Sequence, residues 1–289
     1  MKRLNSMRSA LLVVGVIVTF GCASTFAANG EEQAKPRSYL ELSASGKLSI
    51  VPYVWEREAH GKHVAVIGTR HRYDPRSPMY DRIEAIFKRI QPQLVLHENV
   101  APEDLAVEPR DQAIRRAADL GFAVYLAHRY GVSVQSADAP VKEEIKALLA
   151  RYPAEDVFVF LTAQRLIGSE RNPDLKANAV EYPGFLENYL IQNGLPRKKD
   201  WEAWGGFLKE YKRVVGHPLI GKSWNPDLLS PIRNASRLNQ VARTSDEFRD
   251  HYLLVTIKMA LQKYDRVVVI FGGWHVLALE PELDGMLKN

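Results

Sequence analysis

Two histidines of the chain share one local context, because each stands three residues after a glycine that ends a short apolar run. The first occurs in Gly68-Thr69-Arg70-His71 and the second in Gly272-Gly273-Trp274-His275. Imidazole binds divalent metals and transfers protons near neutral pH. A single histidine after a strand is usually a hydrogen-bonded structural residue, so it is the repetition of the context that indicates a site.

Carboxylates stand at two comparable positions. Glu98 follows the apolar run 93–97, and Asp138 follows the run 132–136. Two histidines and a carboxylate are the ligand types of a catalytic zinc site with an open position, and they also suit manganese or cobalt. A metal bound there would lower the pKa of its water and polarise a carbonyl group. These residue types therefore predict a divalent metal centre, with structural hydrogen bonding as the alternative.

Arg249 is the cationic candidate. It precedes Leu253 by four residues and so extends the apolar face of a predicted buried helix. A guanidinium in that position needs an acceptor. A structural ion pair with Asp138 or Asp250 would satisfy it, and stabilisation of a developing oxyanion would be its functional role.

The pattern of apolar residues predicts a sheet that brings these positions together. It predicts strands at 62–68, 93–97, 132–136 and 266–271, and helices at 78–90, 111–130 and from 244 to about 264. Strands alternating with helices indicate a largely parallel sheet, in which ligands bind beyond the carboxyl ends of the strands. Thr244 and Glu247 fit a capping box at the start of the last helix. His97 alternates with Glu98 along its strand and is expected to point into the core.

The middle of the chain differs from its two ends. From Val141 to about Ala242 the sequence shows helical patterns separated by proline and glycine, with no convincing strand. The aromatic residues of this segment are Trp201, Trp204, Phe207 and Tyr211. They are interpreted as the core of a helical insertion, with a lid that contacts the substrate as the alternative.

The N-terminus has the composition of an export signal. Three basic residues precede an apolar run from Ala10 to Phe20, which is shorter than the roughly 20 residues that span a bilayer. Cleavage after Ala27 would release a soluble exported protein, and lipid modification of Cys22 would leave a membrane-attached lipoprotein. An uncleaved anchor is the third outcome. We therefore expect a periplasmic or extracellular protein.

Charge and cysteine content exclude several classes of site. The formal charge of +5 includes Lys2, Arg3 and Arg8 of the signal, which leaves +2, too small to predict a nucleic-acid partner. Cys22 is the single cysteine, so any metal must be held by His, Asp or Glu, and membrane contact is expected only through a lipid on that residue. The motifs GxSxG and HExxH and a glycine-rich phosphate loop are absent.

The order of these motifs resembles that of the TraB/PrgY/GumN group and of the Tiki metalloproteases. The shared features are Gly68-Thr69-x-His71, a helix and Leu96-x-Glu98, and later Arg249-Asp250 at a helix start, a strand and Gly272-x-x-His275. The resemblance covers about residues 60–139 and 244–288. The haem-binding ChaN lipoproteins and the erythromycin esterases are more distantly similar.

The resemblance implies an α/β fold whose N- and C-terminal parts meet around one site, and a divalent-metal-dependent hydrolase. It implies that His71, Glu98 and His275 are metal-binding or catalytic positions and that Arg249 is the site arginine. Glu98 is expected to be either a ligand or the general base. The group often has a glycine shortly after the second histidine, whereas Val276-Leu277-Ala278 follow here, so the resemblance does not fix the shape of the pocket floor or the substrate.

Together these observations predict a mixed, largely parallel α/β sheet flanked by helices. The predicted divisions are a signal peptide at 1–27, a linker at 28–45, an N-terminal α/β part at 46–140, a helical insertion at 141–243 and a C-terminal α/β part at 244–289. The expected function is exported, metal-dependent hydrolysis of a peptide or ester, with Glu98, Arg249 and Asp138 as catalytic residues. A ChaN-like protein that binds haem or another ligand, and a metal-free esterase using His71 and Glu98, are the alternatives.

Overall fold

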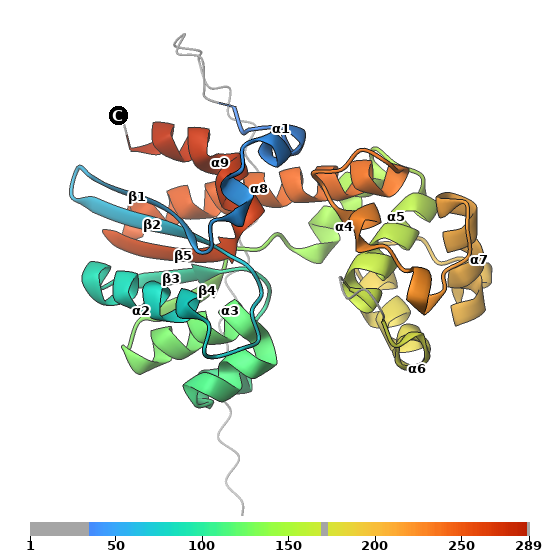
Figure 1. Cartoon of the computed structure of the whole chain (residues 1–289), viewed down its shortest axis with the longest axis horizontal. Helices are drawn as coiled ribbons and strands as arrows, with labels where there is room; N and C mark the ends of the chain where they lie inside the picture. The colour runs from blue at the N-terminus through green and yellow to red at the C-terminus, as the bar shows by residue number, and fades with distance from the viewer. Residues whose placement is uncertain (1–34, 169–172, 288–289) are drawn as a thin grey trace, which may run out of the picture. The chain divides into compact units, whose positions relative to one another are not determined.

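Five strands form one sheet in the order β1-β2-β5-β3-β4 in the computed structural model, which describes residues 35–168 and 173–287 (Figure 1). The strands are β1 Tyr53–Ala59, β2 Lys62–Thr69, β3 Leu94–His97, β4 Ser133–Ser136 and β5 Arg266–Gly272. The edge strand β1 is antiparallel to β2, and the other neighbours are parallel. The mixed, largely parallel α/β fold is confirmed. The predicted signal peptide lies outside the described residues.

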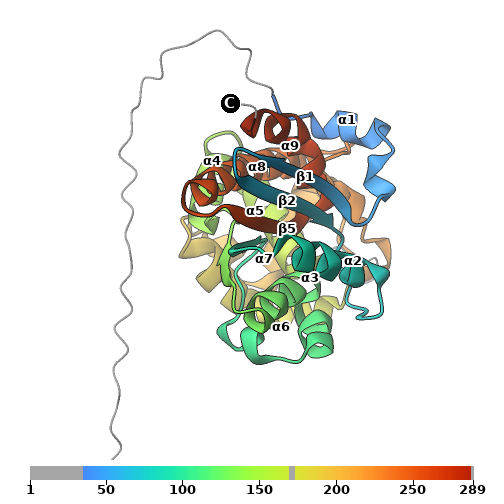
Figure 2. The same cartoon turned by 90° about the vertical axis from the view of Figure 1, so that its left-hand side faces the viewer.

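Helices cover both faces of the sheet (Figure 2). They are α2 Pro78–Ile90, α3 Arg110–Arg129, α8 Arg237–Lys263 and α9 Gly273–Met286. Alternate strand residues point to opposite faces, so Val64 and Val66 pack with α8 and α9, whereas Ala65 and Ile67 pack with α2 and α3. Strands that are buried on both faces consist of nearly continuous apolar residues in the sequence, which is why β2 and β5 were predicted correctly.

Helix α3 is broken, although a continuous helix was predicted. Ala117 and Ala118 have non-helical backbone angles, and Ala118 has φ 48° and ψ −128°. The two halves cross closely at Gly121, where an added Cβ would lie 2.0 Å from the carbonyl oxygen of Ala113. The break turns the next residue, Asp119, toward the end of β2.

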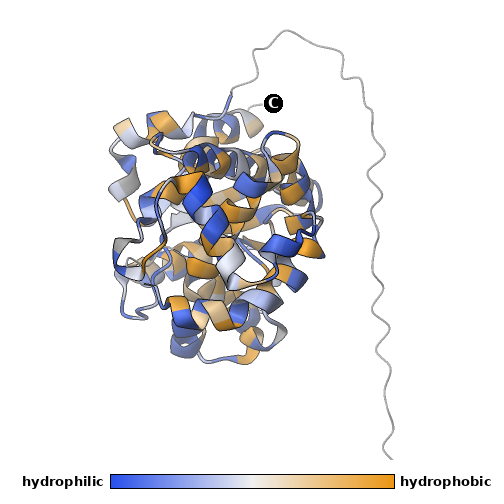
Figure 3. Ribbon diagram, turned by 90° about the vertical axis from the view of Figure 1, so that its right-hand side faces the viewer, coloured by the Kyte–Doolittle hydropathy of each residue, from blue (hydrophilic) through white to orange (hydrophobic). Residues whose placement is uncertain are grey.

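The segment between β4 and α8 has its own apolar core. Its helices are α4 Val141–Leu149, α5 Ala154–Thr162, α6 Leu175–Phe185 and α7 Trp204–Val215, with short turns at η3 Ala163–Ile167, η4 Leu186–Ile191, η5 Lys199–Trp201, η6 Gly221–Ser223 and η7 Pro226–Leu229. Within the described part of 141–242 there is no strand, as predicted. Trp201, Phe207 and Tyr211 are buried in this core, while Trp204 packs at its edge. Figure 3 looks onto this helical part, whose ribbons mix polar and apolar residues.

The start of α8 corrects a prediction. The capping box is formed by Ser236 and Asn239, not by Thr244 and Glu247, so the helix begins at Arg237. Thr244 is an interior residue whose hydroxyl group lies 2.8 Å from that of Tyr152. The predicted boundary at 243/244 therefore falls inside one continuous helix, which packs against α4 and α5 as well as against the sheet.

The described part of the predicted linker is also not a linker. Residues 35–52, called here the N-terminal arm, include α1 Tyr39–Ala44 and the turn η1 Lys47–Ser49. Tyr39 and Leu42 are buried against Leu277 and Ala278 of α9.

One further turn, η2 Glu103–Val107, precedes α3. Among the described helices, none is long and apolar enough to cross a bilayer.

Candidate functional site

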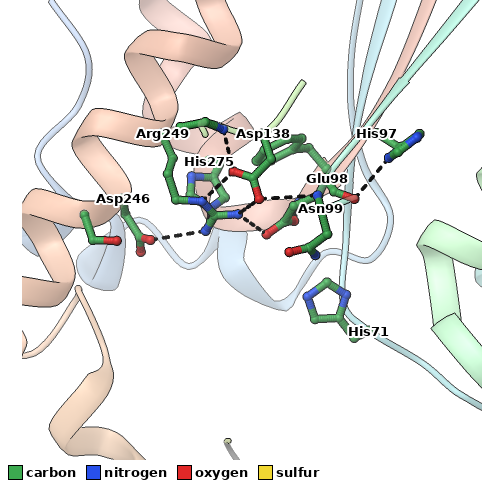
Figure 4. A network of polar contacts seen from close by, with 12 residues as sticks. His71, His97, Glu98, Asn99, Asp138, Asp246, Arg249 and His275 are labelled. Atoms are coloured by element: carbon green, nitrogen blue, oxygen red, sulfur yellow. Dashed lines mark hydrogen bonds and ion pairs between the residues drawn. The ribbon is translucent and has the colours of Figure 1, made fainter. Parts of the chain in front are cut away.

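The carboxyl ends of β2, β3 and β5 meet at one edge of the sheet, because these strands are parallel. His71, Glu98 and His275 leave the strands there, and Asp138 and Arg249 join them from β4 and α8 (Figure 4). The structure therefore brings all five predicted site residues to one region of the molecule. His97 is buried and lies on the far side of Glu98, as expected from the alternation of the strand.

Arg249 lies at the centre of the cluster and is only 4% exposed. Its Nε donates to Asp138 Oδ1 at 2.8 Å, and its Nη2 donates to Asp138 Oδ2 at 3.0 Å and to Glu98 Oε1 at 2.6 Å. The expected ion pair with Asp138 is thus present, and Glu98 is a second partner. Charge-assisted bonds of this kind, with both ends of the fork used, hold a guanidinium in one orientation.

Both oxygens of Glu98 are occupied. Oε1 accepts from Arg249, and Oε2 accepts from the backbone N–H of Gly272 at 2.8 Å. Burial alone raises the pKa of Glu98, but the positive charge of Arg249 outweighs it and holds the pKa well below its usual range. A carboxylate so stabilised is a poor proton acceptor at neutral pH.

Asp138 is fixed by the backbone as well as by Arg249. Its Oδ2 accepts from the N–H of Asn99 at 3.3 Å and its Oδ1 from its neighbour Ala139 at 2.9 Å. Asn99 has φ 64°, a left-handed conformation that asparagine tolerates better than most residues. The turn after Glu98 thus presents an N–H group to Asp138.

His275 is held by residues that lie outside the predicted set. Its Nδ1 lies 2.6 Å from Asp250 Oδ1 and 3.1 Å from the hydroxyl oxygen of Tyr39, and its Nε2 faces Arg249 Nη1 at 3.3 Å. Burial disfavours the charged form of His275, but the Asp250 carboxylate outweighs it and raises the pKa. Arg249 opposes a second proton at Nε2.

His71 differs from His275 because it is open to solvent. Its Nδ1 lies 2.7 Å from Asp119 Oδ1, and 53% of its side chain is exposed. The hydrogen bond and the charge of Asp119 raise the pKa of His71 to about 9. Asp119 itself is buried and also accepts from Thr69 Oγ1 at 2.6 Å. A carboxylate that orients Nδ1–H leaves Nε2 as the free nitrogen.

Asp246 is the least satisfied carboxylate of the cluster. Its nearest described cation is Arg249, with Oδ1 3.6 Å from Nη1. Burial raises the pKa of Asp246 to about 6, and Asp250 adds to this effect. The cluster can therefore take up a proton just below neutrality.

Glycines allow the backbones to approach at this edge. A Cβ on Gly68 would lie 2.8 Å from Gly273 Cα, so the end of β2 touches the start of α9. A small hollow opens beside this contact and is lined by Ile50, Val51, Tyr53, Thr69, Arg70, Gly273, Trp274 and Leu277. Helix α9 begins at Gly273, directly after β5, so its N-terminal end lies at this edge.

In the described structure, most donor atoms of the predicted metal ligands are engaged by other protein groups. Each oxygen of Glu98 already accepts a hydrogen bond, and both nitrogens of His275 face partners, one of them the cationic Arg249. Only His71 keeps a free nitrogen. Across the described ranges, no group of three His, Cys, Asp or Glu side chains is arranged to hold a metal ion. In this arrangement a guanidinium supplies the positive charge that was expected from the ion.

Three residues of the site were missed by sequence reasoning. Asp119 lies in a predicted helix, Tyr39 in the predicted linker, and Asp250 was considered only as a partner of Arg249. The one local signal for Asp119 is that an acidic residue stands among the apolar positions of its helix. No family model and no curated protein matches the chain.

Proposed function

We propose that this chain is a hydrolase that cleaves an ester or amide with a water molecule activated by His71. The observation that carries the proposal is the pair of His71 and Asp119. The carboxylate is buried and the imidazole is half exposed, so a group that must meet substrate is oriented by one that does not. This is the arrangement of a histidine general base and its orienting acid.

In the proposed reaction Nε2 of His71 removes a proton from water while the water oxygen bonds to the carbonyl carbon. The carbonyl oxygen becomes negative as its π bond breaks. The bond to the leaving oxygen or nitrogen then breaks, and the proton on Nε2 is transferred to the leaving group. No other reactant is needed, and Asp119 stays ionised throughout.

The developing negative charge needs donors near the carbonyl oxygen. Arg249 was the expected donor, but its N–H groups are engaged by Asp138, Glu98 and His275, and it is almost completely buried. We assign this role instead to the backbone N–H groups in the first turn of α9, which have no partner within their own helix. Arg249 is then a positioning residue that holds Glu98 against Gly272 at the start of this helix.

The metal-dependent reaction expected from the resemblance remains a prediction that metal analysis can test. Export also remains part of the proposal, since the N-terminal signal is its support.

The test is turnover of chromogenic esters and anilides by the purified chain and by His71→Gln. We expect kcat to fall by about 10²–10⁴-fold, the usual contribution of a general base. His128→Gln, which changes an exposed histidine of α3, is the matched control and should leave kcat unchanged. Chelation should leave the wild-type rate unchanged.

Three results would redirect the assignment. Loss of turnover on chelation, restored by zinc, manganese or cobalt, would favour the metal-dependent hydrolase. A Soret band without turnover would favour the haem-binding alternative. Equal rates for His71→Gln and the wild type would end the proposed role of His71.

A further inference from the structure

The N-terminal arm places one side chain inside the candidate site. The Tyr39 hydroxyl group donates to Asp250 Oδ2 at 2.8 Å and lies 3.1 Å from Nδ1 of His275. Tyr39 is 1% exposed, and its ring meets that of His275 edge-on with centroids 6.4 Å apart. The arm therefore contacts the cluster directly.

These contacts form one continuous chain. Tyr39 donates to one oxygen of Asp250, and the other oxygen lies 2.6 Å from Nδ1 of His275. Arg249 offers only N–H donors, so Nε2 of His275 accepts from it only when the imidazole proton is on Nδ1. Asp250 selects that tautomer, and Tyr39 holds Asp250 in place. Arg249 then continues the chain to Glu98.

The arm is anchored around Tyr39 on both sides. Before it, the backbone N–H of Arg37 donates to Ala278 O at 2.9 Å, and the Arg37 side chain pairs with Glu280. After it, Leu42 packs on α9, and Ile50 lines the hollow beside the first turn of that helix. Several contacts thus fix the position of the Tyr39 hydroxyl group.

We propose that Tyr39 is a positioning residue of the active site, supplied by the arm that precedes the first strand. It acts through Asp250 and His275 on the orientation of Arg249 and Glu98, and it touches no substrate. The effect on kcat rests on the proposed function, whereas the effect on His275 does not.

The test compares Tyr39→Phe with Tyr182→Phe in the full chain. The control also removes a buried hydroxyl group, one that donates to Trp201 O in the helical part. For Tyr39→Phe we expect kcat to fall about tenfold or more with KM within about twofold, since a hydrogen bond to a charged group is lost. Nitrogen-15 NMR should also show faster exchange with water of the His275 Nδ1–H, because Asp250 is no longer held. Tyr182→Phe should change neither quantity.

Asp250→Asn breaks the next hydrogen bond in the series from Tyr39 to Arg249 and is expected to lower kcat at least as much. This second variant keeps the test available if Tyr39→Phe does not fold. An unchanged Nδ1–H signal in Tyr39→Phe, or a loss of kcat no larger than in Tyr182→Phe, would overturn the proposal. If the wild type cleaves no ester or amide, the proposed function fails, and the NMR comparison alone still decides the role of Tyr39.

Discussion

The site at the sheet edge and the interior of the helical part bury polar groups in opposite ways. At the sheet edge the ionisable side chains are mostly buried, and each makes hydrogen bonds of defined geometry. These side chains are those of Arg249, Glu98, Asp138 and His275. In the helical part several buried polar atoms have no hydrogen-bond partner in the described structure. They are Asp156 Oδ2, Thr162 Oγ1, Gln164 Oε1, Arg165 Nε, Asn178 Oδ1 and the Tyr211 hydroxyl oxygen. Asp156 Oδ2 is ion-paired with Arg237, but without hydrogen-bond geometry.

This difference separates two kinds of stabilisation. The helical part is held by apolar packing, for example Phe158 stacked on Trp201 with ring centroids 4.1 Å apart. It also buries several polar atoms that have neither a hydrogen bond nor an ion pair, and each of these costs about 1–3 kcal/mol. The sheet edge has many charges and satisfies most of them. Hydrogen-bonded polar side chains are therefore concentrated where we place the chemistry. The helical part is expected to tolerate replacement of its own polar side chains better.

Arg249→Met should give one of the two largest losses of stability. The change leaves Glu98 and Asp138 buried without their counter-charge, and removal of one partner of a buried ion pair costs about 3–5 kcal/mol. Urea unfolding measures the loss. Arg243→Met is the matched control on the same helix, because Arg243 donates to the carbonyl oxygen of Pro231 and its loss should cost about 1 kcal/mol. Equal stability of the two variants would contradict the comparison.

Trp201→Ala should destabilise the helical part through packing alone. Trp201 is 1% exposed, and truncation of a buried aromatic ring costs about 3–5 kcal/mol. Trp204→Ala, at a half-buried position beside it, should cost less. At a urea concentration where the variant is fully folded, kcat should stay within about twofold of the wild type. A large loss of kcat in folded Trp201→Ala would instead favour a lid that contacts the substrate.

The activity should rise with pH. His71 acts as a base only when neutral, and Asp119 raises its pKa to about 9, so kcat/KM should increase about tenfold per pH unit below 9 and level off above it. Asp119→Asn removes the main cause of the shift. Its profile should level off at a lower pH, nearer the ordinary histidine value, with a smaller maximum because the ring is less well oriented. A profile that Asp119→Asn leaves unchanged would contradict the assignment of His71.

The smallest effect concerns α8, the helix shared by both regions. Ser236→Ala removes the side-chain acceptor of the capping box and should cost about 1 kcal/mol by thermal or urea unfolding. Thr244→Ala should cost about half as much, since that hydroxyl group contacts Tyr152 and caps no backbone group. A larger loss from Thr244→Ala than from Ser236→Ala would contradict the stabilising role assigned to the capping box of Ser236.

The elements that were missed have weak local signals. Strand β1 carries Glu56, Arg57 and Glu58 in its centre, and an edge strand that is partly exposed does not show the continuous apolar run of β2. The arm contributes a helix of only six residues, too short for a helical period to be visible. The start of α8 was placed too late because Ser236 and Asn239 lack the glutamate or glutamine of the usual capping-box pattern, which Thr244 and Glu247 do show.

The sequence by itself determined that His71, Glu98 and His275 stand at the ends of strands, because burial of a parallel strand on both faces requires an apolar run whose end is visible locally. Only the tertiary structure decided the partners, including which of the two candidates, Asp138 and Asp250, pairs with Arg249. Arg249 pairs with Glu98 and Asp138, 151 and 111 residues away, and His71 pairs with Asp119, 48 residues away across a break in α3. Charge pairing has no period along the chain, so which carboxylate meets which base follows from the packing of the helices on the sheet.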